Sequence, residues 1–390
     1  MQLKDRVIMK IDSVAFGGEG VGRINNLVVF VPFSAPGDEL EVEIIQLKKK
    51  FVRGRILKII KQSPLRTKHL CRYYEKCGGC CYQHLDYEYQ LAIKKKQVKE
   101  AFWKIGKIAN PPVLEVIASP RIYNYRGKAQ YHSWVVSDKR EVGFLDISGS
   151  KMVDIENCEI MEETINEKLR ALRGNKRLLH NKDAQLIIWS ECLADQSSKK
   201  ESIVRIVKEK EFLVPRDGFF QANLYLTDKL VDEVCRLTQN DEINTIVDAY
   251  CGSGIFSIFL SSYAKNVVGI EINEKSVKYA QINAENLGLK NVRFIHGDIE
   301  KILKGRFLHQ GDKIDLIVLD PPRTGCEKAV LKAIVDLQPD KIIYISCNPA
   351  TQARDVKCLN ECGYELQSLL PVDMFPQTSH VEVIGFMELK

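Results

Sequence analysis

The feature that most constrains the fold is a regular alternation of short apolar runs with helix-like segments from Asn244 onward. The apolar runs are rich in β-branched residues, which suits strands that are covered on both faces. Helices between such strands return the chain to the start of the next parallel strand. We therefore predict an α/β domain with a doubly wound parallel sheet. Its predicted strands are 245–250, 267–271, 292–295, 314–320 and 341–346, and its clearest helices are 255–262 and 274–287.

The ends of two of these strands carry residues that suit a nucleoside-containing cofactor. Gly252 and Gly254 follow the first strand, where glycines let a ligand approach the backbone closely. Glu271 ends the second strand, and its carboxylate can accept hydrogen bonds from both hydroxyls of a ribose. A motif for NAD would place a third glycine where this chain has Ser257. The pattern therefore disfavours a nicotinamide cofactor.

The last predicted strand, 341–346, ends directly before Cys347. Asn348 and Pro349 end the strand, and we predict Thr351 as the N-cap of a helix through residues 352–356. A cysteine at the carboxyl edge of a parallel sheet, beside a helix N-terminus, is in a position that favours a thiolate and a ligand. A single cysteine is more often structural, so the interpretation depends on the rest of the chain.

The N-terminal residues predict a small β-barrel of the OB type with a basic surface. Strands are indicated at 6–14, 27–31, 39–45 and 53–60, with glycine, asparagine and proline turns between them. From Gln46 to Leu70 there are nine Lys or Arg and no acidic residue. Such a run is either a solvated barrel rim or a surface for a polyanion, and its purity favours the polyanion.

The chain has twelve cysteines, and neither a signal-peptide pattern nor an apolar run of membrane-spanning length. We therefore expect a cytoplasmic protein with reduced thiols that can bind a metal or act in catalysis. Cys71, Cys77 and Cys80 bring three thiols together around a Gly-Gly pair, and we choose Cys158 as the fourth ligand. Cys81 would be strained as a ligand beside Cys80. Spacing alone leaves zinc and an iron–sulfur cluster both open.

The length requires more than one core, and we expect three domains. These are a barrel at 1–65, a central α+β domain with the cysteine ligands at 66–212, and the α/β domain at 213–390. A predicted helix at 87–105 could pack on the last of these. Basic and aromatic residues interleave at 121–131, which suits either RNA bases and phosphates or a half-buried strand. Residues 183–214 indicate only strands and a charged turn at 197–201.

Several motifs together resemble known families. The glycines and Glu271 resemble class I (Rossmann-like) S-adenosylmethionine methyltransferases, and the segment from Gly18 through the Pro36-Gly37 turn resembles the TRAM domain, an RNA-binding module. Arg323 follows Asp320-Pro-Pro, where amino-methylating enzymes have an aromatic residue. The order of three C-terminal motifs then resembles the RNA uracil-5-methyltransferases, and these motifs are Asp320-Pro-Pro-Arg-Thr-Gly325, Ser346-Cys347-Asn348-Pro349 and His380-Val-Glu382.

This resemblance implies a mechanism and a set of site residues. Cys347 would add to C6 of uracil, which makes C5 nucleophilic toward the methyl group, and Glu382 would remove the C5 proton. Arg323 or Asp320 would hold the uracil, and the sequence does not decide between them. The residues implied to bind S-adenosylmethionine are Gln221, Tyr250, Gly252, Gly254, Ile255, Glu271, Asp298 and Asp320.

The resemblance also implies a cluster and a substrate. The spacing of Cys71, Cys77, Cys80 and the distant Cys158 is similar to the 4Fe-4S site of one branch of the family, with zinc as the alternative. We expect structured RNA as partner, specifically 23S ribosomal RNA, with no DNA, no membrane and a monomeric chain. A tRNA uridine-54 methyltransferase is the alternative enzyme. A metal-bearing RNA-binding protein without catalysis is the alternative from another class.

Overall fold

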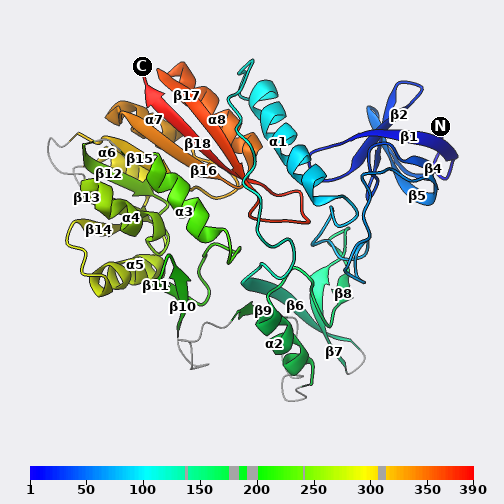
Figure 1. The fold of residues 1–390 in the computed structure, drawn as a ribbon, viewed down its shortest axis with the longest axis horizontal. Coiled ribbons are helices and arrows are strands. Elements are labelled where there is room, and N and C mark those ends of the chain that lie inside the picture. Colours follow the sequence, from blue (N-terminus) through cyan, green and yellow to red (C-terminus); the bar gives the residue numbers. More distant parts are fainter. Residues whose placement is uncertain (137–138, 175–183, 191–200, 240–241, 306–312) are drawn as a thin grey trace. The chain divides into compact units, whose positions relative to one another are not determined.

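The computed structural model describes residues 1–136, 139–174, 184–190, 201–239, 242–305 and 313–390. The chain forms two compact units (Figure 1). Unit 1 contains Met1–Gln97, Arg121–Ser190 and Phe375–His380, and unit 2 contains Val98–Pro120, Glu191–Met374 and Val381–Lys390. The charged turn predicted at 197–201 lies, apart from Glu201, outside the described residues. The domain boundaries near residues 65 and 212 stay a prediction.

The N-terminal strands of unit 1 close into a barrel, as the sequence predicts. The strands are β1 (Arg6–Val14), β2 (Gly20–Ile24), β3 (Leu27–Val31), β4 (Glu39–Leu47) and β5 (Phe51–Lys61), in the order β1-β2-β3-β5-β4. Apolar residues that alternate along the strands fill the interior. At Gly22 an added Cβ would lie 2.3 Å from the Lys10 carbonyl oxygen, so only glycine allows β1 and β2 to pair this closely.

A buried ion pair fixes the turn that leads into β4. The Asp38 carboxylate is fully buried and accepts hydrogen bonds from the backbone N–H groups of Ala35 (2.7 Å) and Ser63 (2.9 Å). The Arg66 guanidinium donates to the same carboxylate at 2.7 Å. Because Ser63 and Arg66 follow β5, these bonds tie the chain leaving the barrel to the turn before β4.

Unit 1 also contains a sheet covered by a helix. Strands β6 (Lys128–Val136), β7 (Lys139–Leu145), β8 (Met152–Asp154) and β9 (Ala184–Trp189) pair in the order β8-β7-β6-β9. Ile165 and Leu169 of α2 (Glu163–Gly174) share a core with Tyr131 of β6. Tyr125 and Tyr131 are fully buried. The strand alternative is therefore correct for Tyr131, which lies on β6, whereas Tyr125 is buried ahead of that strand. Neither side chain is available for stacking on RNA.

Unit 2 contains the predicted parallel sheet. Its seven strands are β12 (Ile243–Ala249), β13 (Ala264–Glu271), β14 (Val292–His296), β15 (Leu316–Leu319), β16 (Lys341–Ser346), β17 (Tyr364–Val372) and β18 (Glu382–Leu389). They are ordered β14-β13-β12-β15-β16-β18-β17, and the first five are parallel. This confirms the predicted doubly wound fold. Strand β18 is antiparallel to both β16 and β17, an arrangement that the alternation of strands and helices did not predict.

The helices and the remaining hairpin of unit 2 either precede β12 or lie between the sheet strands along the chain. The hairpin is β10 (Ser202–Val207) with β11 (Lys210–Pro215), and a short 3₁₀ turn covers Ser261–Tyr263. The helices are α3 (Thr227–Arg236), α4 (Ile255–Leu260), α5 (Glu274–Asn286), α6 (Ile299–Lys304), α7 (Lys328–Leu337) and α8 (Pro349–Glu361). None of the helices in the described ranges is long and apolar enough to cross a membrane.

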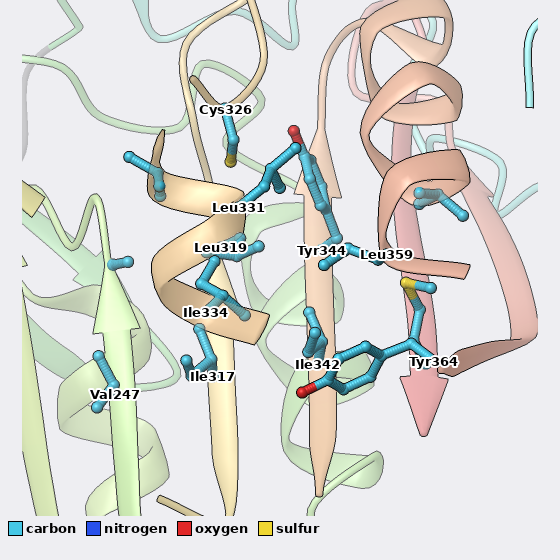
Figure 2. Close-up of a cluster of buried hydrophobic side chains, with 14 of the residues drawn as sticks. Val247, Ile317, Leu319, Cys326, Leu331, Ile334, Ile342, Tyr344, Leu359 and Tyr364 are labelled. Atoms are coloured by element: carbon cyan, nitrogen blue, oxygen red, sulfur yellow. The ribbon is translucent and has the colours of Figure 1, made fainter. Parts of the chain in front are cut away.

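One face of the sheet carries the main core of unit 2. Figure 2 shows Ile317 of β15 and Tyr344 of β16 packed with Leu331 and Ile334 of α7 and Leu359 of α8. The α1 helix (Tyr87–Lys104) contributes Val98 and Phe102 to the same cluster, and both are fully buried. This packing gives the carboxyl ends of β15 and β16 a rigid support.

Removal of the Asp38 carboxylate should destabilise unit 1 strongly. Asp38→Ala leaves the mostly buried Arg66 guanidinium without its partner, and we expect a loss of about 3–5 kcal/mol in unfolding free energy. As control, Glu43→Ala removes the Arg55–Glu43 pair, whose Arg side chain is 66% exposed. That change should cost no more than about 1 kcal/mol. Urea unfolding measures both, and equal losses would contradict the role of the buried pair.

Candidate active site

The carboxyl ends of β12, β13, β15 and β16 form one edge of the sheet in unit 2. Strand β12 pairs with β13 on one side and with β15 on the other. After β12 the chain continues to β13 and β14 on one side and then returns to the other side of β12 as β15. Such a switch point is where open α/β sheets bind ligands. The loops that follow these strands carry most of the site residues that the sequence predicts.

The loop after β12 has a backbone that only certain residues adopt easily. Tyr250, Gly252 and Gly254 all have positive φ angles, of 68°, 54° and 84°. An added Cβ on Gly254 would lie 2.8 Å from Cζ of Phe294, so α4 begins in close contact with β14. An added Cβ on Gly252 would meet no atom within 4 Å. The space beside Gly252 is therefore open to a ligand.

The Glu271 carboxylate lies at the tip of β13 and turns toward this loop. It accepts a hydrogen bond from the backbone N–H of Gly252 at 3.1 Å and one from Asn273 N–H at 2.8 Å. These bonds fix the carboxylate beside the open space. Asp298 is exposed after β14 and accepts from Lys301 N–H at 3.0 Å, where it caps α6. Gln221 is buried ahead of α3, and Ile255 is the first residue of α4.

Asp248 is a residue that the sequence interpretation missed. It lies on β12, fully buried, and accepts hydrogen bonds from the Ser257 N–H (2.9 Å) and hydroxyl (2.5 Å) through Oδ2. Among the described residues its Oδ1 has no partner. The pKa of Asp248 is raised to about 7, mainly by burial and in smaller part by the charge of Glu271. A single acid inside an apolar strand was the available signal.

Cys347 and Glu382 are brought together by the pairing of β16 with β18. Ser346 pairs with Val383 in this antiparallel ladder, so the next step in register places Cys347 opposite Glu382. Gln352 of α8 is fully buried and donates from Nε2 to the carbonyl oxygens of Tyr344 (2.7 Å) and Val383 (3.1 Å). This side chain therefore joins the two strands close to the thiol and the carboxyl group.

Electrostatics link these two residues to Asp320 and Arg323. Burial is the main cause that raises the pKa of the Cys347 thiol to about 11, and the charge of Glu382 adds to the rise. This direction is opposite to the thiolate that the position at the sheet edge predicted. Burial also raises the pKa of Glu382 well above its usual value, with a further rise from Asp320. Arg323 lowers the pKa of both groups and is hydrogen-bonded to the Cys347 side chain. Arg323 is thus the cation that faces both groups.

The loop that carries Arg323 is held by the first turns of α8. The Arg323 carbonyl oxygen accepts from Asn348 Nδ2 at 3.0 Å and from the Thr351 hydroxyl at 3.1 Å. Asn348, and not Thr351, is the N-cap of α8, because its side chain accepts from Ala350 N–H at 3.1 Å. The prediction of Thr351 as N-cap was wrong, since Pro349 starts the helix earlier.

The four predicted cysteine ligands lie in unit 1 and line one cavity of about 510 Å³. Burial is the main cause that raises the pKa of Cys158 to about 12, and the thiols of Cys77 and Cys71 add to the rise. Cys81 is not among the lining residues, and its side chain is hydrogen-bonded to Ser379. In the described part of the chain, no three His, Cys, Asp or Glu side chains lie close enough to hold a single metal ion.

The stability of unit 2 should depend on pH through Asp248. The pKa of this carboxyl is about 7 in the folded chain and has an ordinary value of 3.8. Between these values the folded state binds more protons than the unfolded state, so Asp248 lowers stability as pH rises from 3.8 to about 7. Asp248→Asn cannot ionise. Its melting temperature minus that of the wild type should therefore increase across this window in calorimetry, and a constant difference would contradict the prediction.

Comparisons with known proteins agree with this geometry. The model of the tRNA (uracil-5-)-methyltransferase family matches residues 192–390, and the TRAM domain model matches residues 7–57. An uncharacterized RNA methyltransferase of Halalkalibacterium halodurans is 32% identical over 99% of this chain and 97% of its own length. One from Fusobacterium nucleatum is 34% identical over 100% of this chain and 97% of its own length.

A solved structure extends the similarity to the fold of nearly the whole chain. The tRNA (uracil-54, C5)-methyltransferase of Pyrococcus abyssi, in complex with S-adenosyl-L-homocysteine, has a TM-score of 0.72 and 26% identity. The alignment covers 98% of this chain and 100% of that one. The expected resemblance is therefore confirmed. The chain belongs to the RNA (uracil-5-)-methyltransferase family and is an S-adenosylmethionine-dependent RNA methyltransferase.

Proposed function

We propose that this chain methylates C5 of a uridine in RNA through a transient bond between the Cys347 sulfur and C6 of the base. The observation that carries the proposal is the pairing of β16 with β18, which sets a thiol opposite a buried carboxyl group beside Arg323. An amino-methylating enzyme has no need for a nucleophile next to a base. A uracil C5 enzyme needs both.

The roles follow from the reactivity of uracil. C5 is too weak a carbon nucleophile to accept a methyl group unaided. Addition of the Cys347 thiolate to C6 moves the electron pair of the C5–C6 double bond into an enolate, and C5 becomes reactive. Bound S-adenosylmethionine supplies the methyl group from a sulfonium centre. Glu382 then takes the C5 proton, the C5–C6 double bond forms again, and the C6–sulfur bond breaks to return the thiolate.

The electrostatics of the site suit this sequence of steps. The charge of Glu382 raises the cost of a negative charge on Cys347, so the pair favours one charge at a time. Arg323 stabilises a negative charge on either Cys347 or Glu382. This supports Arg323 over Asp320 as the group that holds the uracil. The raised pKa of Glu382 makes its carboxylate a stronger base toward a carbon-bound proton.

The cofactor edge has features that fit S-adenosylmethionine. The open space at Gly252 and the fixed carboxylate of Glu271 suit a ribose near the backbone. The Oδ1 of Asp248, which has no partner among the described residues, and the half-buried Asp320 provide negative charge for a cation with a sulfonium and an ammonium group. We propose the full set of contacts as Gln221, Tyr250, Gly252, Gly254, Ile255, Glu271, Asp298 and Asp320.

Two substitutions should separate the two chemical roles. Cys347→Ala cannot form the bond to C6, so methylation should fall by at least about 10³-fold and no covalent RNA complex should form. The Glu382→Gln variant keeps Cys347, so its thiolate can still add to C6 and C5 can still take the methyl group, but the variant cannot remove the C5 proton. It should therefore accumulate a covalent complex with unmodified RNA, visible as a shifted band on a denaturing gel.

The control is wild-type protein with RNA that contains 5-fluorouridine. A C5 fluorine cannot leave as a proton does, so the wild type should also accumulate a covalent complex. A binding protein without catalysis would form none. Methylation by Cys347→Ala at the wild-type rate would refute the proposal.

We further propose that Cys71, Cys77, Cys80 and Cys158 hold a 4Fe-4S cluster with a structural or RNA-positioning role. What supports a cluster over zinc is the arrangement of four thiols around one cavity, since a cubane spaces its ligands farther apart than a single ion does. Four thiolate ligands would leave no iron open to substrate.

Cys158→Ala should remove most of the bound iron and the broad visible absorbance of anaerobically purified protein. Cys81→Ala is the matched control, because Cys81 is adjacent to Cys80 but does not line the cavity. It should retain iron at the wild-type ratio. Stoichiometric zinc without iron in anaerobic protein would support the zinc alternative.

We propose 23S ribosomal RNA as the substrate, supported by the cysteine-lined cavity in a chain with a TRAM domain. The similarity to the Pyrococcus abyssi enzyme favours uridine 54 of tRNA as the second candidate. In either RNA the uridine must leave the base stack, which costs least in a loop. A deletion strain should lose 5-methyluridine from 23S ribosomal RNA and keep it in tRNA, and the reverse pattern would support tRNA.

A further inference from the structure

The last turn of α1 exposes a large aromatic side chain among cations. Trp103 is 55% exposed, while its neighbour Phe102 is fully buried in the core of unit 2. The Lys104 ammonium lies 5.9 Å from the centre of the indole ring. Lys99 is one turn earlier on the helix and Lys107 follows its end, and both are exposed.

The chain leaves the helix in a way that shapes a hollow beside the indole. Lys107 has a left-handed φ of 59°, and an added Cβ on Gly106 would lie 2.7 Å from the Phe102 carbonyl oxygen. Ile108 N–H donates to that same oxygen at 3.1 Å, so the turn is tight. The hollow has a volume of about 430 Å³, and its lining residues are Trp103, Lys104, Lys107 and Ala109.

The charge around the hollow selects for an anion. Glu100 pairs with Lys104 at 2.7 Å and offsets one of the three lysines. Favourable interaction with the carboxyl end of the helix can account for the lysines. It does not account for the indole, because burial of a tryptophan is strongly favourable and an exposed one commonly serves binding.

An indole face next to ammonium groups matches a nucleotide, which has a π-face and a phosphate. Bases in a duplex already stack on each other, so a base that stacks on Trp103 must be unpaired. The family acts on RNA, and the loops of a structured RNA contain unpaired nucleotides that offer both a base face and a phosphate.

We propose that the Trp103 hollow is an accessory RNA site that stacks one unpaired nucleotide of the substrate, outside the methylated uridine, with its phosphate at Lys107. This site rests on RNA being the substrate and does not depend on which RNA is methylated. Its lining residues do not include Cys347 or Glu382.

The test uses full-length protein and a single-stranded oligoadenylate of about twelve nucleotides, with tryptophan fluorescence and anisotropy as readouts. Stacking should quench the fluorescence of Trp103, which is exposed. The other two tryptophans of the chain are Trp134 and Trp189. Trp103→Ala should weaken binding by about tenfold and lose the quench. Trp103→Phe should lose the quench and retain affinity within about threefold, because phenylalanine also stacks.

Further variants isolate the charge and provide the control. Lys107→Ala should reduce the slope of log affinity against log salt by about 0.7. Ile105→Ala removes another exposed apolar side chain of the same turn, 40% exposed, and should bind as the wild type does. Cys347→Ala should keep the quench, so failure of the covalent mechanism and failure of this site give different results.

Two outcomes would overturn the inference. One is oligoadenylate affinity of Trp103→Ala within about twofold of the wild type, with the quench intact. The other is a change of oligomeric state in Trp103→Ala without a change in RNA affinity, which would identify a protein contact instead. Melting curves of each variant establish that it is folded, and Trp103→Phe tests the same site with the smaller structural change.

Discussion

The structure of the candidate site depends on one strand pairing, the antiparallel contact of β18 with β16 next to the five parallel strands. Only this pairing sets the residue after β16, Cys347, opposite the first residue of β18, Glu382. A slip of one residue would turn Glu382 to the other face of the sheet. The buried amide of Gln352 joins both strands at this point, although its own Oε1 has no partner among the described residues. Register is therefore maintained at some cost in stability.

Burial of several carboxyl groups at one edge is the second constraint. Asp248, Asp320 and Glu382 all have raised pKa values, with burial as the main cause in each. Carboxyl groups so close together repel one another when they ionise, and a cation relieves that cost. Arg323 provides one cation from the chain itself. A cofactor that carries positive charge would provide another, which gives a physical reason for its affinity to this edge.

Unit 1 contains the barrel that the TRAM domain model matches. Its barrel has a core of alternating apolar residues and a surface rich in lysine and arginine. Because the core maintains the fold, the surface residues of the barrel can be substituted without loss of the fold. The cysteine cavity lies in the same unit and is built from segments distant in the sequence, around Cys71 to Cys80 and around Cys158. A ligand bound by cysteines of both segments would hold the two segments together and so stabilise unit 1.

The sequence alone determined the parts of this protein that depend on local pattern. The barrel strands, the parallel strands and the helix after Cys347 follow from apolar periodicity and turn residues, and the motif order identified the family. Tertiary structure decided the rest. It buried Tyr125 and Tyr131, moved the helix cap to Asn348, placed Arg323 beside the thiol and revealed Asp248 as a buried acid. These outcomes depend on contacts between distant segments, and periodicity carries no information about which buried side chain will meet which neighbour.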